Sequence, residues 1–270
     1  MYLQALHPRA VRGVMQNSDV RRDAWGRLMR TASFVGTTTY GTTEDAERAG
    51  ARVRRIHRML TATDPDTGER YGVDEPALLM WVHCAEIDSY LHVARRSGLR
   101  LTGAEADRYV AEHRQSARLV GLDPDAAPGD RAEMAECFEK VRPDLSAGPE
   151  AREVDDFLLR PPTHPLLVPA REVDDFLLRP PTHPLLVPAR EVLWRRVAHL
   201  AYASLPPYAH ELYGRPAPAP ATVTRQLRLA GLLLRRIPAR VRRQLPPKHV
   251  LRAMARLGPD ARPAPYKLGR

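Results

Sequence analysis

The chain is a succession of amphipathic segments whose ends carry helix-capping residues, and this pattern restricts the fold more than any other feature. In residues 102–121, Thr102 and Glu105 have the spacing of a capping box, and Gly121 stands where a helix commonly ends in a left-handed conformation. Residues 74–98 open with acidic side chains and a proline, and they close with two arginines and a glycine. Both segments are predicted helices.

Two further helices are predicted ahead of these, over residues 18–36 and 42–60, because a Ser-Asp pair and a Thr-Thr pair stand at their starts as N-caps. Residues 36–42, rich in Gly and Thr, are predicted as a loop or a short extended piece, and residues 63–76 as another loop. Long strand-like alternation is absent, and 26 prolines against 16 glycines indicate many punctuated helices. A chain of 270 residues buries one substantial core. We therefore expect an all-α protein, a single bundle of roughly ten helices.

An exact repeat interrupts the second half of the chain. Residues 151–169 read AREVDDFLLRPPTHPLLVP, and residues 170–188 repeat them at every position. Two perfect copies indicate a tandem duplication or a sequence error and not a solenoid, which needs more repeats. Because a core built for one unit has no second slot for the same apolar face, we expect one copy to pack and the other to protrude as a helix and a proline-rich loop.

The formal net charge of +10 is concentrated at the end of the chain. Residues 222–270 contain 13 Lys and Arg against one Asp, which leaves 29 of the 42 basic and 31 of the 32 acidic side chains in residues 1–221. We therefore divide the chain into a main helical domain and a basic amphipathic tail of two short helices, broken at Pro238 and Pro246. With Tyr266 as its only aromatic residue the tail is poorly suited to nucleic acid, so an anionic membrane or an acidic partner is the better expectation.

The cysteines and the apolar runs indicate the cellular compartment in which the protein is expected. Cys84 and Cys137 are widely separated and form no CxxC, so the sequence predicts neither a zinc site nor a disulfide framework. No charged start with an apolar segment behind it is seen, and apolar runs such as LAGLLL at 229–234 are far too short to span a bilayer. We expect a cytoplasmic protein, with a peripheral membrane contact through the basic tail.

Two histidines occupy predicted inner faces of helices. His57, in RVRRIHRML, shares its face with Val53, Ile56 and Leu60, and His83 points inward from the helix over residues 74–98. In such positions a histidine is most often a satisfied core or rim residue, and metal ligation is the less common alternative.

A second polar group lies on the helix over residues 18–36. Arg27, Arg30 and Thr31 fall at i, i+3 and i+4 and share one face with Phe34. Either the arginines extend from an amphipathic rim into solvent, or the face contacts a bound anion or small polar ligand.

Five blocks in order carry a resemblance to a known family: LQALHPRAVRGV, SDVRRDAWGRLMRT, YGTTEDAERAGARVRRIHRML, YGVDEPALLMWVHCAEIDSYL and LTGAEADRYVAEHRQSARLVGLDP. Over most of residues 2–214 the chain resembles the oxygenase family of MpaB and the bacterial latex clearing protein. The resemblance implies an all-α bundle around a non-covalently bound b-type haem, which agrees with the absence of a CxxCH motif. Family members usually have further sequence before the first block, so one wall of the haem pocket is expected to be open.

The resemblance also implies roles for individual residues. A VRxxHxxV histidine holds the iron in that family, and VRRIHRML makes His57 the matching ligand. An Arg-x-x-Lys-Thr group in the latex enzyme matches Arg27, Arg30 and Thr31 as catalytic residues, with arginine replacing the lysine. Since an arginine stays protonated, an open or water-bound sixth position is implied. Arg27 would also neutralise a haem propionate, Thr31 would hydrogen-bond dioxygen, and His83 is the rival cofactor-binding histidine.

The leading functional expectation is a haem b-dependent oxygenase that acts with O2 on an apolar, isoprenoid substrate. His7 in LHPRA either lines the pocket or caps a helix, and no acidic residue matches the glutamate base of the latex enzyme. Two alternatives stay open. One is a binding protein that docks through its basic tail, and the other is a haem-binding protein without turnover.

Overall fold

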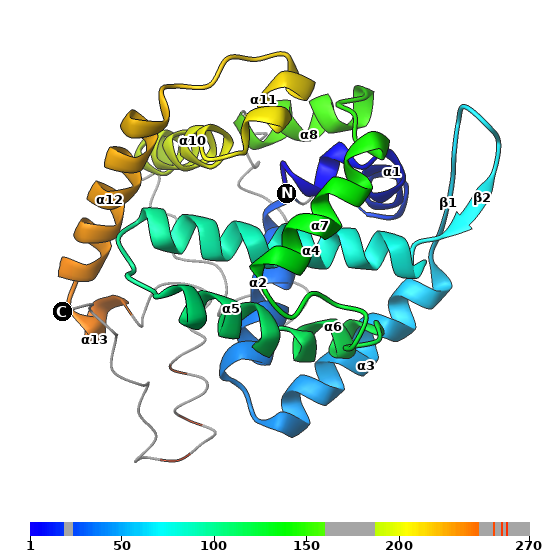
Figure 1. Ribbon diagram of the computed structural model, residues 1–270, viewed down its shortest axis with the longest axis horizontal. Helices are drawn as coiled ribbons and strands as arrows, with labels where there is room; N and C mark the ends of the chain where they lie inside the picture. Colours follow the sequence, from blue (N-terminus) through cyan, green and yellow to red (C-terminus); the bar gives the residue numbers. More distant parts are fainter. Residues whose placement is uncertain (19–23, 160–186, 243–250, 252–254, 256–257, 259–270) are drawn as a thin grey trace.

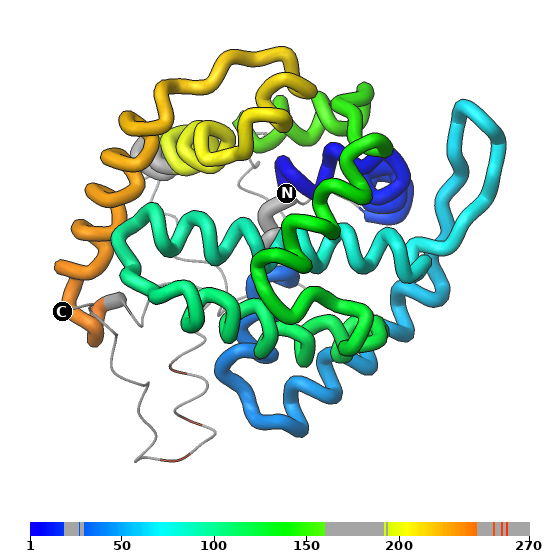
Figure 2. The backbone as a smooth tube through the Cα atoms, viewed as in Figure 1, coloured from blue at the N-terminus to red at the C-terminus, as the bar shows by residue number. Residues whose placement is uncertain are grey.

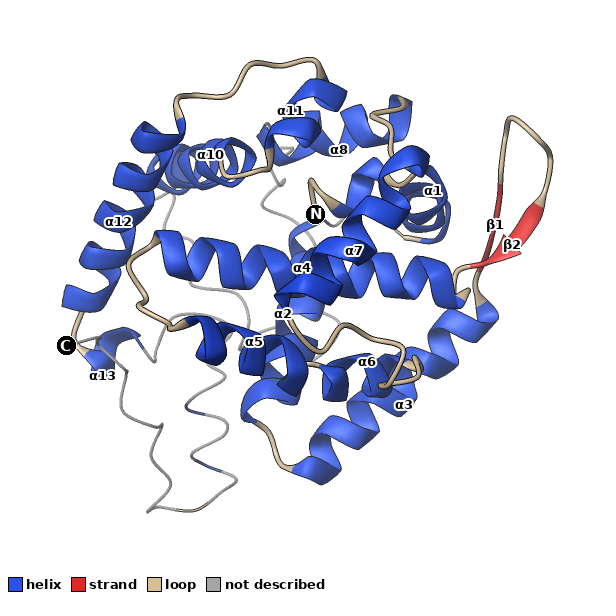
Figure 3. Ribbon diagram, in the orientation of Figure 1, coloured by secondary structure: helices blue, strands red, loops and turns tan. Residues whose placement is uncertain are grey.

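The computed structural model describes residues 1–18, 24–159, 187–242, 251, 255 and 258 of the protein. Helices dominate this part of the chain, and the sheet in it is a single two-stranded hairpin, so the predicted all-α bundle of roughly ten helices is confirmed (Figure 1, Figure 3). The α-helices are α1 Pro8–Asn17, α2 Ala24–Tyr40, α3 Thr43–Met59, α4 Pro76–Arg96, α5 Gly103–Glu112, α6 Arg114–Val120, α7 Arg131–Val141, α8 Pro149–Leu159, α10 Val187–Ala203, α11 Pro207–Tyr213, α12 Pro220–Arg236 and α13 Ala239–Arg242. Two 3-10 helices, η1 Gln4–Leu6 and η2 Arg142–Asp144, and two strands, β1 Thr61–Thr63 and β2 Arg70–Gly72, complete the described elements.

Helix α4 runs through the middle of the bundle, as Figure 1 shows. It packs against α1, α5, α6, α7 and α12. As predicted, a proline starts it, and the chain turns beyond its last arginines at Gly98, which has φ 100°. Trp81 is fully buried in its middle and donates a hydrogen bond from Nε1 to the carbonyl of Gln4 at 3.1 Å. The first residues of the chain are thereby held against the central helix.

The start of the chain is part of the main core. Tyr2 and Leu6 are 5% and 0% exposed. The hydroxyl of Tyr213 in α11 donates to the carbonyl of Tyr2 at 2.8 Å, and the amide of Ser146 donates to the carbonyl of Leu6 at 2.8 Å. Buried backbone groups of the first turn are therefore satisfied by segments far along the chain.

Helices α2 and α3 form a hairpin whose turn is shorter than predicted. The predicted loop over residues 36–42 is wrong for most of its length, because α2 continues through Tyr40 and only two residues separate it from α3. Thr38 and Thr39 donate their hydroxyls to carbonyls one turn back, at 2.7 to 3.1 Å, which accommodates them in the helix. Thr42 is the N-cap of α3, accepting from the amide of Asp45 at 3.1 Å. Ser18, one of two predicted N-caps for α2, instead ends α1, and Asp19 lies outside the described residues.

The helix predicted over residues 102–121 is divided in two. The capping box of Thr102 and Glu105 is present, and Gly121 has φ 103°, so both predicted ends are confirmed. The interruption is at His113, whose Nδ1 lies 2.8 Å from the carbonyl of Tyr109. A side chain at this carbonyl competes with the helical ladder, so α5 ends at Glu112 and α6 starts at Arg114.

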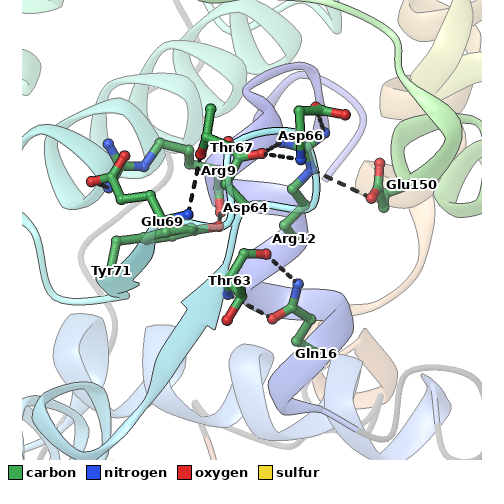
Figure 4. A network of polar contacts seen from close by, with 10 residues as sticks. All are labelled: Arg9, Arg12, Gln16, Thr63, Asp64, Asp66, Thr67, Glu69, Tyr71 and Glu150. Carbon is green, nitrogen blue, oxygen red and sulfur yellow. Dashed lines mark hydrogen bonds and ion pairs between the residues drawn. The ribbon is translucent and has the colours of Figure 1, made fainter.

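A β-hairpin replaces part of the loop predicted over residues 63–76, and it is held by polar contacts to α1 (Figure 4). Gln16 hydrogen-bonds both backbone groups of Thr63, at 2.8 and 2.9 Å, as a neighbouring strand would. Beside it, the guanidinium of Arg12 contacts three carboxylates at 2.7 to 3.4 Å, those of Asp64, Asp66 and Glu150. The hairpin, α1 and α8 therefore meet at one buried arginine.

The first helix of the predicted basic tail packs on the bundle. Figure 2 shows α12 alongside the ends of α10 and α4. Val223 and Leu227 are 0% and 5% exposed, and Arg96 of α4 donates hydrogen bonds to Thr224 and to the carbonyl of Pro220. The predicted break at Pro238 separates α12 from α13, whereas Pro246 lies outside the described residues. Within the described helices, no segment is both long and apolar enough to cross a membrane.

The duplicated segment is described only at its two ends. Helix α8 contains residues 151–159 of the first copy, and Ala151, Val154 and Leu158 are buried at 1%, 2% and 8% exposure. Residues 160–186 lie outside the described part, and α10 starts within the last two residues of the second copy. The beginning of the first copy thus packs, and the prediction for the second copy stays a prediction.

Candidate functional site

The α2–α3 hairpin brings Arg27 and His57 to the ends of two contacting helices that lie away from the connecting turn. Arg27 lies 13 residues before the end of α2, and His57 lies 14 residues after the start of α3. At about 1.5 Å per residue, both are roughly 20 Å from the connecting turn. The charge of Arg27 acts on the His57 imidazole, so the two groups are near enough to interact electrostatically.

His57 is half-buried, and its surroundings favour the neutral ring. Burial lowers the pKa of His57 below its usual value, the positive charge of Arg27 acts in the same direction, and the carboxylate of Asp74 opposes them. A neutral imidazole has a free lone pair near pH 7. Nδ1 of His57 is buried and has no hydrogen-bonding partner among the described residues. A ring nitrogen removed from water without a partner is costly, and a ligand would remove that cost.

The predicted inner face around His57 is only partly correct. Val53 and Leu60 are half-buried, but Ile56 is 37% exposed. His57 is therefore at the edge of the packed interior, because it lies in the last turn of α3 where the chain leaves for β1.

The polar face of α2 divides into a half-buried and an exposed part. Arg27 is half-buried and hydrogen-bonds the hydroxyl of Ser18, whereas Arg30 and Thr31 are exposed. Burial lowers the pKa of Arg27, and the neighbouring charge of Arg30 lowers it further, but an arginine remains a cation. A fixed, partly desolvated positive charge is thus available beside His57 for an anionic group.

His83 lies in different surroundings. It is 7% exposed on α4, and burial lowers its pKa to about 4, with a smaller contribution from His113 at the junction of α5 and α6. No described contact joins His83 to His57 or Arg27. The other predicted pocket residue, His7, is at the N-cap position of α1 without a side-chain capping bond, and its buried Nδ1 has no hydrogen-bonding partner in the described part of the chain.

Asp74 was not identified from the sequence. It follows β2 and precedes α4, and the hairpin returns it to the vicinity of His57, 17 positions back along the chain. No helical spacing relates residues on two elements joined by a hairpin, so local periodicity contains no signal for this pair.

The side chains around His57 are better suited to bind a metal held in a macrocycle, such as haem, than a free metal ion. In the described residues no group of three or more His, Cys, Asp and Glu side chains could hold an ion. A haem needs only one axial side chain, together with positive charge for its propionates. The unsatisfied nitrogen of His57 and the half-buried charge of Arg27 fit these two requirements.

A separate cavity lies away from these residues. Its volume is about 290 Å³, and Leu159, Arg195, His199 and Arg215 line it near the ends of α8 and α10. None of the predicted site residues lines it, and the carboxylate of Asp155 pairs with one of its two arginines, Arg215.

Comparison with known proteins identifies the family. Residues 1–243 match the family model for the catalytic domain described as ER-bound oxygenase mpaB/B'/Rubber oxygenase. A search of the curated proteins and a search of the solved structures each found no significant match. The matched region contains the α2–α3 hairpin, the central helix α4 and the packed helix α12. The chain therefore belongs to the family of mpaB and rubber oxygenase catalytic domains, and it is an oxygenase-family protein.

Proposed function

We propose that this protein is a haem b-dependent oxygenase that uses O2 to oxidise an apolar substrate with an isoprenoid double bond, and that His57 is the axial ligand. The observation that carries the proposal is the buried Nδ1 of His57, which lacks a partner among the described residues and lies in the family's catalytic domain. The lowered pKa of His57 supports it, because the neutral ring is the ligating form.

The residues on α2 would bind and orient the group. Arg27 provides a half-buried cation for a propionate, while Arg30 and Thr31 present a guanidinium and a hydroxyl one turn further along the helix. Haem, when bound, supplies the activation of O2. The half-buried side chains of Val53 and Leu60, on either side of His57 in the chain, would help to exclude water and favour a lipophilic substrate.

Haem titration followed by absorption spectroscopy tests the ligand assignment. The parent chain should bind one haem with a Soret band, and His57→Ala should abolish stoichiometric binding. His83→Ala should retain haem and lose stability, because His83 is a buried packing residue. The exposed His92 offers a matched control, since His92→Ala removes an imidazole from the surface of α4. Equal haem occupancy in His57→Ala and the parent would exclude His57 as the ligand.

The polar face of α2 is tested separately. Arg27→Ala and Thr31→Ala should retain some haem but change its spectrum or the rate of O2 consumption, since both are proposed to act on the bound group or its surroundings. Unchanged spectra and rates in both variants would show that this face of α2 is a solvated surface that does not contact the haem. A normal Soret band without O2 consumption over a panel of isoprenoid substrates would instead favour a haem-binding protein without turnover.

We further propose that α12 docks on an anionic membrane surface. Its outer face carries large apolar residues that are 45% to 57% exposed, Leu229, Leu232 and Leu233. Exposed arginines lie between and beside them on the same face, Arg225, Arg228 and Arg236, and α12 contains no acidic residue. An apolar row flanked by cations is the pattern of a helix that lies in a lipid interface.

Vesicle sedimentation tests this surface. The full chain should sediment with vesicles of phosphatidylcholine and phosphatidylserine and remain in solution with phosphatidylcholine alone. Leu229→Ser with Leu232→Ser should reduce binding, and Arg225→Gln with Arg228→Gln should increase its sensitivity to salt. The matched control is Arg108→Gln, on the exposed face of α5. Equal binding to both vesicle types, or unchanged binding of the leucine variant, would contradict the proposal.

A further inference from the structure

The two cysteines, which the sequence leaves unrelated, meet between α4 and α7. Figure 1 shows α7 crossing α4, and the Sγ atoms of Cys84 and Cys137 lie 3.0 Å apart. Both are free thiols, and they are 53 positions apart in the chain. A sulfur–sulfur distance this short needs only a small shift to form a covalent bond.

The two thiols differ in accessibility. Cys84 is 0% exposed and packs in the apolar cluster of Ile87, Leu91, Val110 and Met134. Cys137 is half-buried at the edge of the same cluster. A small oxidant can therefore reach Cys137, whereas Cys84 is shielded from it and is already in contact with its partner.

We propose that Cys84 and Cys137 are a peroxide-responsive thiol pair that closes reversibly to a disulfide linking α4 to α7. In the first step the thiolate of Cys137 attacks hydrogen peroxide, an S–O bond forms, the O–O bond breaks, and after protonation one water leaves with Cys137 as a sulfenic acid. In the second step the Cys84 sulfur attacks the sulfenic sulfur, the S–O bond breaks, and the thiol proton leaves with the hydroxyl as a second water. Two thiols and one peroxide thus give one disulfide and two waters.

The surroundings of Cys137 support its role as the first sulfur to react. The hydrogen bond with the Cys84 thiol lowers the pKa of Cys137, and the ammonium of Lys140, one turn along α7, lowers it further, although burial acts in the opposite direction. The thiolate is the reactive form of cysteine, so this position favours attack on an oxidant.

The disulfide would stabilise the centre of the bundle. It closes a loop of 53 residues between the central helix and α7, which restricts the unfolded chain. The apparent Tm should rise by roughly 5 °C on oxidation and return on reduction.

The test is thiol counting by alkylation and mass spectrometry on the full chain, before and after a small molar excess of hydrogen peroxide. The parent should lose both thiols together, gain an intramolecular Cys84–Cys137 peptide link, and recover both thiols with dithiothreitol. In Cys84→Ala, Cys137 should stop at a sulfenic acid that dimedone traps. In Cys137→Ala, the buried Cys84 should keep its thiol under the same treatment.

Two results would overturn the proposal. One is a parent protein in which dimedone labels Cys137 while Cys84 remains a free thiol, because the second step would then not occur. The other is a disulfide between two copies of the chain in place of the internal link. Circular dichroism of the reduced alanine variants confirms that each is folded before oxidation, and Cys84→Ser and Cys137→Ser provide a second pair if an alanine variant unfolds.

Discussion

His83 is a buried histidine that the fold holds in its neutral form. At 7% exposure the imidazolium would lose its hydration, and this burial lowers the pKa to about 4 from its usual value of 6.5. A histidine with a depressed pKa stabilises the folded state fully above its unfolded pKa and loses that contribution as the pH falls toward the folded pKa. The relevant window is therefore between pH 6.5 and pH 4.

We expect the free energy of unfolding of the haem-free protein to fall by about 2 kcal/mol through His83 alone between about pH 7.5 and about pH 5. His83→Gln removes the titration and keeps a polar side chain of similar length, so the variant should be less stable near neutrality and should lose less stability on acidification. Urea unfolding of both proteins at the two pH values measures the difference. An identical pH dependence in the variant would show that His83 is not the titrating group.

Arg12 is the second residue whose role follows from its surroundings. It is 8% exposed and contacts Asp64, Asp66 and Glu150, of which Asp64 and Glu150 have side chains only 16% and 24% exposed. Removing the cation would leave the carboxylates of Asp64 and Glu150 close together with little access to water, beside the exposed carboxylate of Asp66.

Arg12→Met should therefore lower the free energy of unfolding by roughly 2 to 4 kcal/mol. The control is Arg48→Met, because Arg48 also contacts two carboxylates but has a side chain 63% exposed, and its loss should cost less than about 1 kcal/mol. Chemical denaturation of both variants provides the comparison. Similar losses in the two would show that burial of the Arg12 network contributes nothing beyond a surface ion pair.

At the scale of elements, the docking of α12 on α4 depends on a glycine. A Cβ atom at Gly231 would lie 2.4 Å from the carbonyl oxygen of Ser97, at the end of α4, so the two backbones approach more closely than a side chain allows. The guanidinium of Arg235 also donates to this carbonyl, at 3.1 Å. The close approach and the hydrogen bond hold the same end of the helix.

Gly231→Ala should separate α12 from α4 and lower the free energy of unfolding by about 1 to 3 kcal/mol, despite the better helix propensity of alanine. Gly148→Ala is a suitable control, because the nearest atom to its added Cβ is 3.7 Å away on a flexible glutamate side chain. Thermal unfolding of both variants measures the effect, and hydrogen exchange in α12 locates it. A stabilised Gly231→Ala protein would mean that α12 shifts without cost.

At the scale of the whole molecule, the open question is whether the bundle needs both copies of the duplicated segment. Because the copies are identical, deleting residues 151–169 or 170–188 gives the same chain. Helix α8 uses the start of the first copy, with Val154 at 2% exposure in the main core. One copy is therefore expected to provide every contact that the core requires.

The deletion variant should fold, bind haem as the parent does, and show equal or higher Tm, since the deletion removes the copy that we predict to protrude. Point variants distinguish the copies. Val154→Ser should lower the free energy of unfolding by about 2 kcal/mol or more, and Val173→Ser, at the equivalent position of the second copy, should have little effect. Haem titration, thermal unfolding and limited proteolysis measure these outcomes. Loss of folding on deletion, or equal effects of the two serines, would show that both copies pack.

Local features were predictable from the sequence because their partners are near neighbours in the chain. The capping box of Thr102 and Glu105, the left-handed Gly121 and the N-cap Thr42 each involve backbone groups within a few residues, so the residue types identify them. The all-α class and the family follow from many such signals in order. The errors at residues 36–42 and 63–76 arose where tertiary contacts or hydroxyl back-bonding outweighed the turn tendency of Gly, Thr and Asp.

The sequence by itself determined the helical class, most helix ends and the choice of His57, Arg27, Arg30 and Thr31 as candidates. Only the tertiary structure decided which of these share surroundings: it brought Arg27 and Asp74 to His57, gave His83 different neighbours, and joined Cys84 to Cys137. The physical reason is the sequence separation of the interacting residues. Helix signals depend on hydrogen bonds between residues about four positions apart, whereas these pairings depend on how long helices pack against one another.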